Sequence, residues 1–174
     1  MSEPVRDASI DARSQFAATS SGDDGRVDDR NAGLSLICRV GTRSCALPLG
    51  CVVEIMRPLP IEALAGSPAF VRGLALIRGV PLPVVDVARL LGDPEAPCGR
   101  FVVVDTGSRR VALAFGDVLG VRALPAAMLH PLAPLLSETD AEAVETIGRL
   151  DSELLLMLGS ARIDVDDAAV AEIR

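Results

Sequence analysis

Few side chains in this 174-residue sequence could perform catalysis or hold a metal ion. It contains a single histidine, His130, and its four cysteines form no C-x-x-C pair: Cys38, Cys45, Cys51 and Cys98. One imidazole excludes most histidine metal sites and most catalytic dyads that need a histidine base. We therefore expect no metal site, and we interpret the cysteines as small buried side chains rather than as disulfides.

Four carboxylates at predicted strand ends or turns are the remaining candidates for acid–base chemistry: Glu54, Asp86, Asp105 and Asp117. No G-x-S-x-G elbow, Walker loop or glycine-rich dinucleotide loop occurs in a strand–helix setting. Carboxylates at such positions more often cap backbone N–H groups or pair with arginine. The sequence predicts that the protein is not an enzyme and carries no cofactor.

Glu54 and Arg78 differ from the other charged residues because each lies in an apolar stretch, VVEIM and LALIRGV. An unpaired charge in such surroundings is costly. Two interpretations remain open. The two side chains could join two strands through an arginine–carboxylate contact, or they could point into water from opposite ends of a sheet.

The elements that must position these residues are mainly short strands. Apolar residues alternate with polar ones in LSLICRV (34–40), and three further strand–turn–strand pairs follow later in the chain. Pro81 and Pro83 lie two residues apart, so their strand is expected to be an edge or to be bulged. Helices are few: Asp86 is expected to cap VARLL, and a helix is expected at the C-terminus. The fold class predicted is mainly β.

An internal repeat supports two similar β units. A shift of 66 residues places GTR (41–43) on GSR (107–109), Gly50 on Gly116 and Ile55 on Val121. Each unit is too short to make a good core alone. Two such units packed together would create a groove between them where a partner could bind.

Composition limits the partners and the compartment. Residues 1–33 are rich in Ser, Asp, Gly and Arg without a period, which predicts a disordered acidic tail before a domain at 34–174. A net charge of −7 and an aromatic content of 2% disfavour nucleic acid. The N-terminus has no signal-peptide core, and no apolar run reaches the roughly 18 residues of a membrane helix. We expect a cytoplasmic protein without direct membrane insertion.

The stretch FVRGLALIRGVPLPVVDVARLLG (70–92) resembles the central part of CheW-like domains, where a short helix leads to an N-L-R-G turn, a V-x-P-V-x-D-L strand and a helix. LSLICRVG, CVVEIM, FGDVLGV and PAAMLHPLAPL resemble the flanking elements of the same family. The resemblance extends from Leu34 to the C-terminus.

This resemblance implies two packed five-stranded SH3-like β-barrels with an apolar groove between them, a few short helices and a C-terminal helix. It implies a non-catalytic adaptor in chemotaxis or chemosensory signal transduction, recruited to membrane receptor arrays. Its partners would be the cytoplasmic tip of a methyl-accepting chemoreceptor and the regulatory domain of a CheA-type histidine kinase. The receptor-binding residues implied are Val52, Glu54, Arg78, Val118 and Val121. Leu135 takes a kinase-binding position where the family has an aromatic residue.

Two other functions remain open from the sequence. One is a small-ligand-binding or enzymatic domain that uses the groove between the β units. The other is a divergent CheW-like protein that competes with the true coupling protein and damps signalling.

Overall fold

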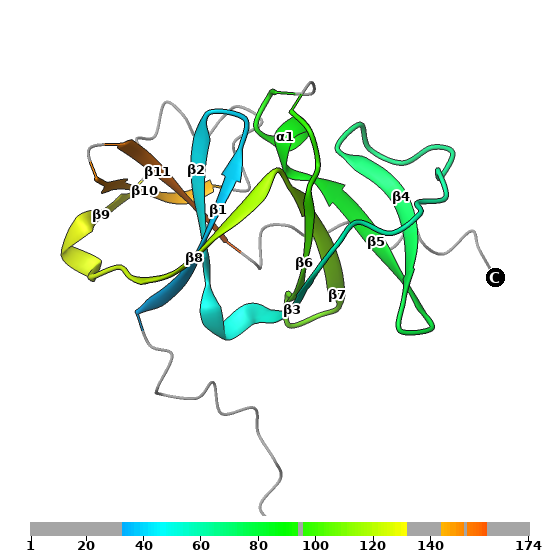
Figure 1. The fold of residues 1–174 in the computed structure, drawn as a ribbon, viewed down its shortest axis with the longest axis horizontal. Coiled ribbons are helices and arrows are strands. Elements are labelled where there is room, and N and C mark those ends of the chain that lie inside the picture. Colours follow the sequence, from blue (N-terminus) through cyan, green and yellow to red (C-terminus); the bar gives the residue numbers. More distant parts are fainter. Residues whose placement is uncertain (1–32, 94–95, 132–143, 152, 160–174) are drawn as a thin grey trace, which may run out of the picture.

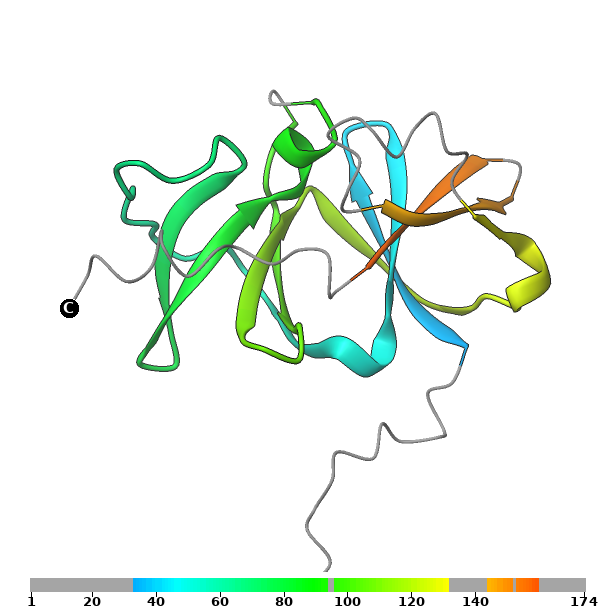
Figure 2. The same ribbon diagram turned by 180° about the vertical axis from the view of Figure 1, so that it is seen from behind.

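The described part of the chain forms two β-sheets that pack against each other (Figures 1 and 2). The structure is a computed structural model that describes residues 33–93, 96–131, 144–151 and 153–159. Sheet A has the strand order β8-β1-β2-β11-β10-β9, and sheet B has the order β3-β6-β7-β5-β4. The strands are β1 (Leu34–Val40), β2 (Arg43–Pro48), β3 (Val52–Met56), β4 (Val71–Ile77), β5 (Val80–Asp86), β6 (Arg100–Asp105), β7 (Arg110–Phe115), β8 (Asp117–Ala123), β9 (Leu129–Pro131), β10 (Val144–Leu150) and β11 (Glu153–Leu158). The helical segments are η2 (Leu49–Cys51), α1 (Val87–Leu90) and η3 (Ala126–Met128).

Each sheet takes strands from both halves of the chain. β1 and β2 form an antiparallel hairpin in sheet A, but β3 leaves that sheet and pairs with β6 in sheet B. In the same way, β6 and β7 form a hairpin in sheet B, and β8 returns to pair with β1 in sheet A. The hairpin β4–β5 joins β7 through a parallel ladder, and β10–β11 joins β2 likewise. The 66-residue repeat is therefore present in the structure, but neither repeat forms a sheet of its own.

The main core lies between the sheets. Alternation along β1 turns Leu36 and Cys38 toward this core, where they join a cluster that contains Val102 and Phe115 of sheet B. Each sheet also covers a smaller apolar cluster, around Phe101 in sheet B and around residues such as Leu155 in sheet A. Central strands are thus buried on both faces, which explains near-continuous apolar runs such as FVVV and VALAF.

Two local predictions are confirmed. β5 as a whole is an inner strand of sheet B, but its segment with Pro81 and Pro83 is a local edge that pairs with β4 only, because the parallel ladder between β5 and β7 begins at Val84. The carboxylate of Asp86 caps α1 and accepts hydrogen bonds from the backbone N–H groups of Ala88 and Arg89.

The predicted fold class is confirmed as mainly β, with two sheets and few helices. Sheet A has six strands rather than the five expected, because the three-residue strand β9 pairs with β10. The predicted C-terminal helix and residues 1–32 of the predicted tail lie outside the described residues. Within the described residues, none of the helices is long and apolar enough to cross a membrane.

Candidate functional site

Glu54 and Arg78 form an ion pair that joins the two edges of sheet B. Glu54 lies on β3 at one edge, and Arg78 follows β4 at the other edge. The Nη2 atom of Arg78 lies 2.7 Å from Oε2 of Glu54, and Nε lies 2.9 Å from Oε2 and 3.1 Å from Oε1. Sheet B must therefore curl until its first and last strands in the sheet order meet at this point. The structure selects the strand-joining contact over the two separate solvent-facing side chains.

Local backbone geometry places both side chains. Arg78 and Gly79 are the central residues of a two-residue turn between the paired residues Ile77 and Val80. Both adopt positive φ, 50° for Arg78 and 81° for Gly79, which is the geometry of a tight hairpin turn with a right-handed strand twist. On β3 the register shifts between Val52 and Glu54, and such a bulge re-aims the side chain that follows it.

The ion pair is exposed on the arginine side and sheltered on the glutamate side. The side chain of Arg78 is 78% exposed and that of Glu54 is 20% exposed. Hydrogen bonds from Arg78 lower the pKa of the Glu54 carboxyl, and the same contact raises the pKa of Arg78. Both groups are therefore charged at neutral pH, and the guanidinium presents its free edge to solvent.

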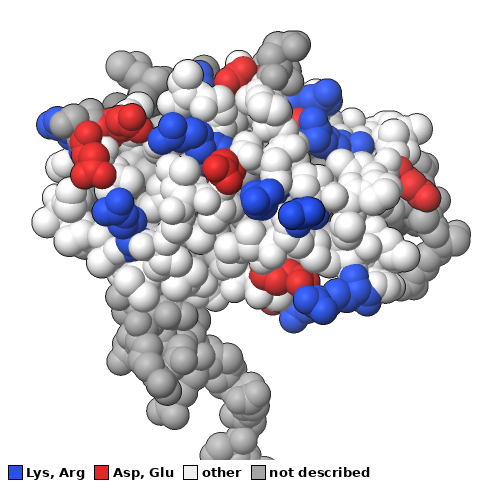
Figure 3. Space-filling view, in the orientation of Figure 1, with Lys and Arg blue, Asp and Glu red and all other residues white. Residues whose placement is uncertain are grey.

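Aliphatic side chains lie exposed on the elements that carry the ion pair. On β3, Val53 and Ile55 are 44% and 45% exposed, and on the β4–β5 hairpin Leu76 and Val80 are 66% and 54% exposed. Charged side chains are scattered over an otherwise uncharged face of the molecule (Figure 3). Aliphatic surface with few charges is typical of a protein-binding face, and a polyanion would need a dense basic patch.

The other predicted receptor-binding residues divide into two groups. Val52 and Val118 are equivalent under the 66-residue repeat, and both are half-buried against the core between the sheets. Val121 is 47% exposed on β8. Leu135 lies outside the described residues. A groove between the sheets stays a prediction.

The remaining carboxylates have structural contacts. Asp86 caps α1 and also pairs with Arg72, whose Nε lies 2.8 Å from Oδ2. Asp105 accepts a hydrogen bond from the N–H of Gly107, and Asp117 accepts one from the N–H of Val118. The Asp86–Arg72 pair was missed in the sequence, because the strand register that aligns them depends on pairing between β4 and β5. Among the described residues, no three His, Cys, Asp or Glu side chains gather as metal ligands would.

The sequence and the fold also match known proteins. The family model of the CheW-like domain matches residues 35–165. The chain belongs to the CheW-like family. The family assignment predicted from the sequence is thereby confirmed.

Individual relatives of this CheW-like protein include Protein FrzA of Myxococcus xanthus, which is 36% identical over 107 residues. That match covers 60% of this chain and 66% of FrzA. A probable chemotaxis protein CheW of Rhizobium etli is 26% identical, over 69% of this chain and 79% of the relative. The scaffolding protein TtCheW of Thermoanaerobacter tengcongensis has the same fold, with a TM-score of 0.65 and 19% identity over 72% of this chain and 88% of that protein.

Proposed function

We propose that this CheW-like protein is a non-catalytic adaptor that couples the cytoplasmic tips of chemoreceptors to a CheA-type histidine kinase. Family membership supports this role. The observation that carries it is the ion pair of Glu54 and Arg78, which lies among exposed aliphatic side chains at the positions where the family resemblance places receptor contact. Coupling by contact needs neither cofactor nor catalytic group, so the protein would work in the cytoplasm and reach the membrane through the receptor.

The proposed receptor face consists of Val52, Glu54, Arg78, Val118 and Val121. We expect its exposed and its half-buried residues to contribute in different ways. Exposed side chains such as Arg78 and Val121 would contact the receptor directly, because a few well-placed anchors dominate the affinity of protein interfaces. Val52 and Val118 would act by supporting β3 and β8 from the core side. Glu54 would hold Arg78 in place and so reduce the side-chain entropy lost on binding.

The test is a pull-down of the full chain with the signalling tip of its own receptor and, separately, with the regulatory domain of the kinase. Arg78→Ala should weaken capture of the receptor and leave capture of the kinase domain unchanged. Arg149→Ala is the matched control, because Arg149 is an exposed arginine on β10 of the other sheet. Receptor capture that Arg78→Ala leaves at the level of the control would refute the assignment of this face.

Kinase contact is proposed at Leu135 on the family resemblance alone. Removal of the Leu135 side chain should therefore lower capture of the kinase domain and leave capture of the receptor unchanged. Kinase activity in a mixture with receptor and kinase then separates a coupler from a damping protein. We expect added protein to raise phosphorylation by the kinase, whereas a damping protein would lower it.

A further inference from the structure

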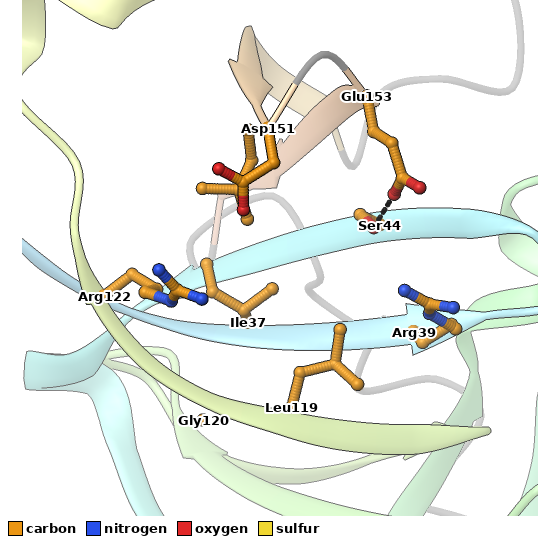
Figure 4. Close-up of a pocket in the computed structure, with 9 residues that line it drawn as sticks. Ile37, Arg39, Ser44, Leu119, Gly120, Arg122, Asp151 and Glu153 are labelled. Carbon is orange, nitrogen blue, oxygen red and sulfur yellow. Dashed lines mark hydrogen bonds between the residues drawn. The ribbon is translucent and has the colours of Figure 1, made fainter.

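A cavity of about 250 Å³ opens within sheet A, away from the ion pair of sheet B (Figure 4). One wall is formed by β1 and β8, and the opposite wall is formed by Leu150, Asp151 and Glu153 of the β10–β11 hairpin. Ile37, Leu119 and Leu150 are the apolar residues of a lining that is otherwise mainly polar and charged, and of these Leu119 is 49% exposed. The proposed coupling function does not use this cavity.

The internal repeat explains why a cavity forms here. A shift of 66 residues places Glu54 of β3 on Gly120 of β8, so the glutamate position has no side chain in sheet A. The arginine position is also changed. The hairpins β4–β5 and β10–β11 are equivalent in the sheet order, since each joins its sheet through the parallel ladder of its second strand. Arg78 follows β4 with φ of 50°, and Asp151 follows β10 with φ of 48°.

The cavity therefore occupies the place that the ion pair fills in sheet B. A Cβ atom added to Gly120 would meet nothing within 4 Å, which agrees with open space at this position. Gly120 and Asp151 both line the cavity.

Charges of opposite sign face each other across this space. Arg122 of β8 and Arg39 of β1 extend on opposite sides of Ile37, and Asp151 lies over Ile37 and Arg122, whereas Arg39 lies toward Ser44 (Figure 4). Glu153 stands on the same side as Asp151 and accepts a hydrogen bond of 3.2 Å from the Ser44 hydroxyl. Within the described residues, neither arginine forms an ion pair, so both guanidinium groups are available to a ligand.

We propose that this cavity binds a small aliphatic zwitterion, of the chemical class of the free branched α-amino acids. The ligand carboxylate would accept hydrogen bonds from Arg122, and its ammonium group would donate to Asp151, which lies on the same side of Ile37. The aliphatic side chain would lie against Leu119 and Leu150. A phosphate or dicarboxylate would face the repulsion of two carboxylates, and a diamine would face two guanidinium groups. The volume is below the roughly 300–1,000 Å³ of pockets for larger ligands.

The test is a ¹H–¹⁵N NMR titration of the full chain with L-leucine. We expect saturable shifts at the backbone amides of Ile37, Gly120 and Asp151, with a Kd of about 1 mM. The single-charge analogues 4-methylpentanoate and 3-methylbutylamine should bind at least about tenfold more weakly, since each loses one of the two charged contacts, worth about 1.4 kcal/mol or more.

Two variants and one control complete the test. Arg122→Gln and Asp151→Asn should each raise the Kd for leucine at least about tenfold. Asparagine tolerates the positive φ of position 151, so that variant should fold. Arg149→Gln, an exposed residue of β10 that does not line the cavity, should leave the Kd unchanged.

Absence of saturable shifts with leucine, valine and alanine would overturn the proposal. So would equal binding of the single-charge analogues, or shifts confined to residues away from the cavity. None of the five proposed receptor-binding residues lines the cavity, but Leu119, Gly120 and Arg122 lie beside Val118 and Val121 on β8, so leucine binding and receptor capture are measured separately. Receptor capture by the Arg122→Gln variant is measured in parallel, so that an effect on leucine binding is distinguished from an effect on receptor binding.

Discussion

Most of the Arg78 side chain lies in solvent, although it makes three short contacts with Glu54. Exposed ion pairs contribute little to stability, because water and salt screen them and ordering two long side chains costs entropy. The pair therefore fixes the position of a charge more than it stabilises the fold. For this reason Arg78→Ala is expected to report on binding while the thermal midpoint changes little.

The Glu54 carboxyl should titrate below the ordinary range of glutamate. Its pKa is lower in the folded than in the unfolded chain, so the contact stabilises the fold above the ordinary glutamate pKa. This contribution is lost as the pH falls through the lowered folded-state value. A ¹³C NMR titration of the Glu54 carboxyl carbon would measure it. In Arg78→Ala the pH midpoint of the Glu54 titration should move upward. An unchanged pH midpoint would show that the ion pair does not form in solution.

The cysteines should differ sharply in reactivity. Cys38 of β1 and Cys45 of β2 are free thiols that lie opposite each other in the strand register, and both are fully buried. Burial raises the pKa of the Cys38 thiol, and it raises that of Cys45 to about 12. Iodoacetamide at pH 8 should therefore modify neither in the folded protein. Mass spectrometry should find any early label on the half-buried Cys51 and Cys98, and all four labelled only in denaturant.

At the residue scale, the sequence could nominate Glu54 and Arg78 but could not decide between contact and separation. Their contact requires the two edges of sheet B to meet, and that curvature depends on packing among distant strands. Gly120 and Asp151 were missed for a related reason. A glycine and a turn aspartate can be recognised as cavity residues only when the positions of the repeat are compared on the folded strands.

At the element scale, the edge of sheet B at β4 is covered by an isolated bridge. The backbones of Glu62 and Leu74 exchange two hydrogen bonds of 2.8 Å. Gly73 permits this approach: its φ is 137°, and an added Cβ would overlap the carbonyl oxygen of Glu62. Covering an edge strand in this way protects it from pairing with other chains.

Gly73→Ala should therefore destabilise the protein strongly, by about 3 kcal/mol or more, through both backbone strain and displacement of Glu62. Gly79→Ala is the matched control, because Gly79 also has positive φ but an added Cβ would meet nothing within 4 Å. The control should cost about 1–2 kcal/mol. Urea unfolding followed by circular dichroism measures both, and equal losses would mean that the close approach to Glu62 has no energetic importance.

The hairpins could be predicted from the sequence, whereas the strand pairings that join one hairpin to another could not. Alternation and turn residues identified β1–β2, β4–β5, β6–β7 and β10–β11 from the sequence. The parallel ladders that join these hairpins connect residues far apart in the chain, such as Ala46 with Met157. No local pattern specifies such a pairing, because it forms only when both hairpins cover the same core.

At the scale of the whole molecule, the exchange of strands between the sheets should make unfolding cooperative. Neither sheet can open without breaking ladders to strands from the other half of the chain, and both sheets share one core. NMR amide signals of Ile37 in sheet A and Val103 in sheet B should disappear at the same urea concentration. NMR is needed because the sequence has neither Trp nor Tyr. Separate midpoints for the two sheets would contradict this expectation.

The exchange of strands also bears on how such a chain could arise. In the described residues, the ladders β1–β8, β2–β11, β3–β6 and β5–β7 all run between the first five strands and the later ones. A shorter ancestor with only one repeat would have had no complete sheet of its own, and could have obtained one by swapping strands with a second copy. Gene duplication and fusion would then convert a symmetric dimer into one polypeptide whose halves could diverge. The Glu54–Arg78 pair and the open site at Gly120 would then be two outcomes of that divergence.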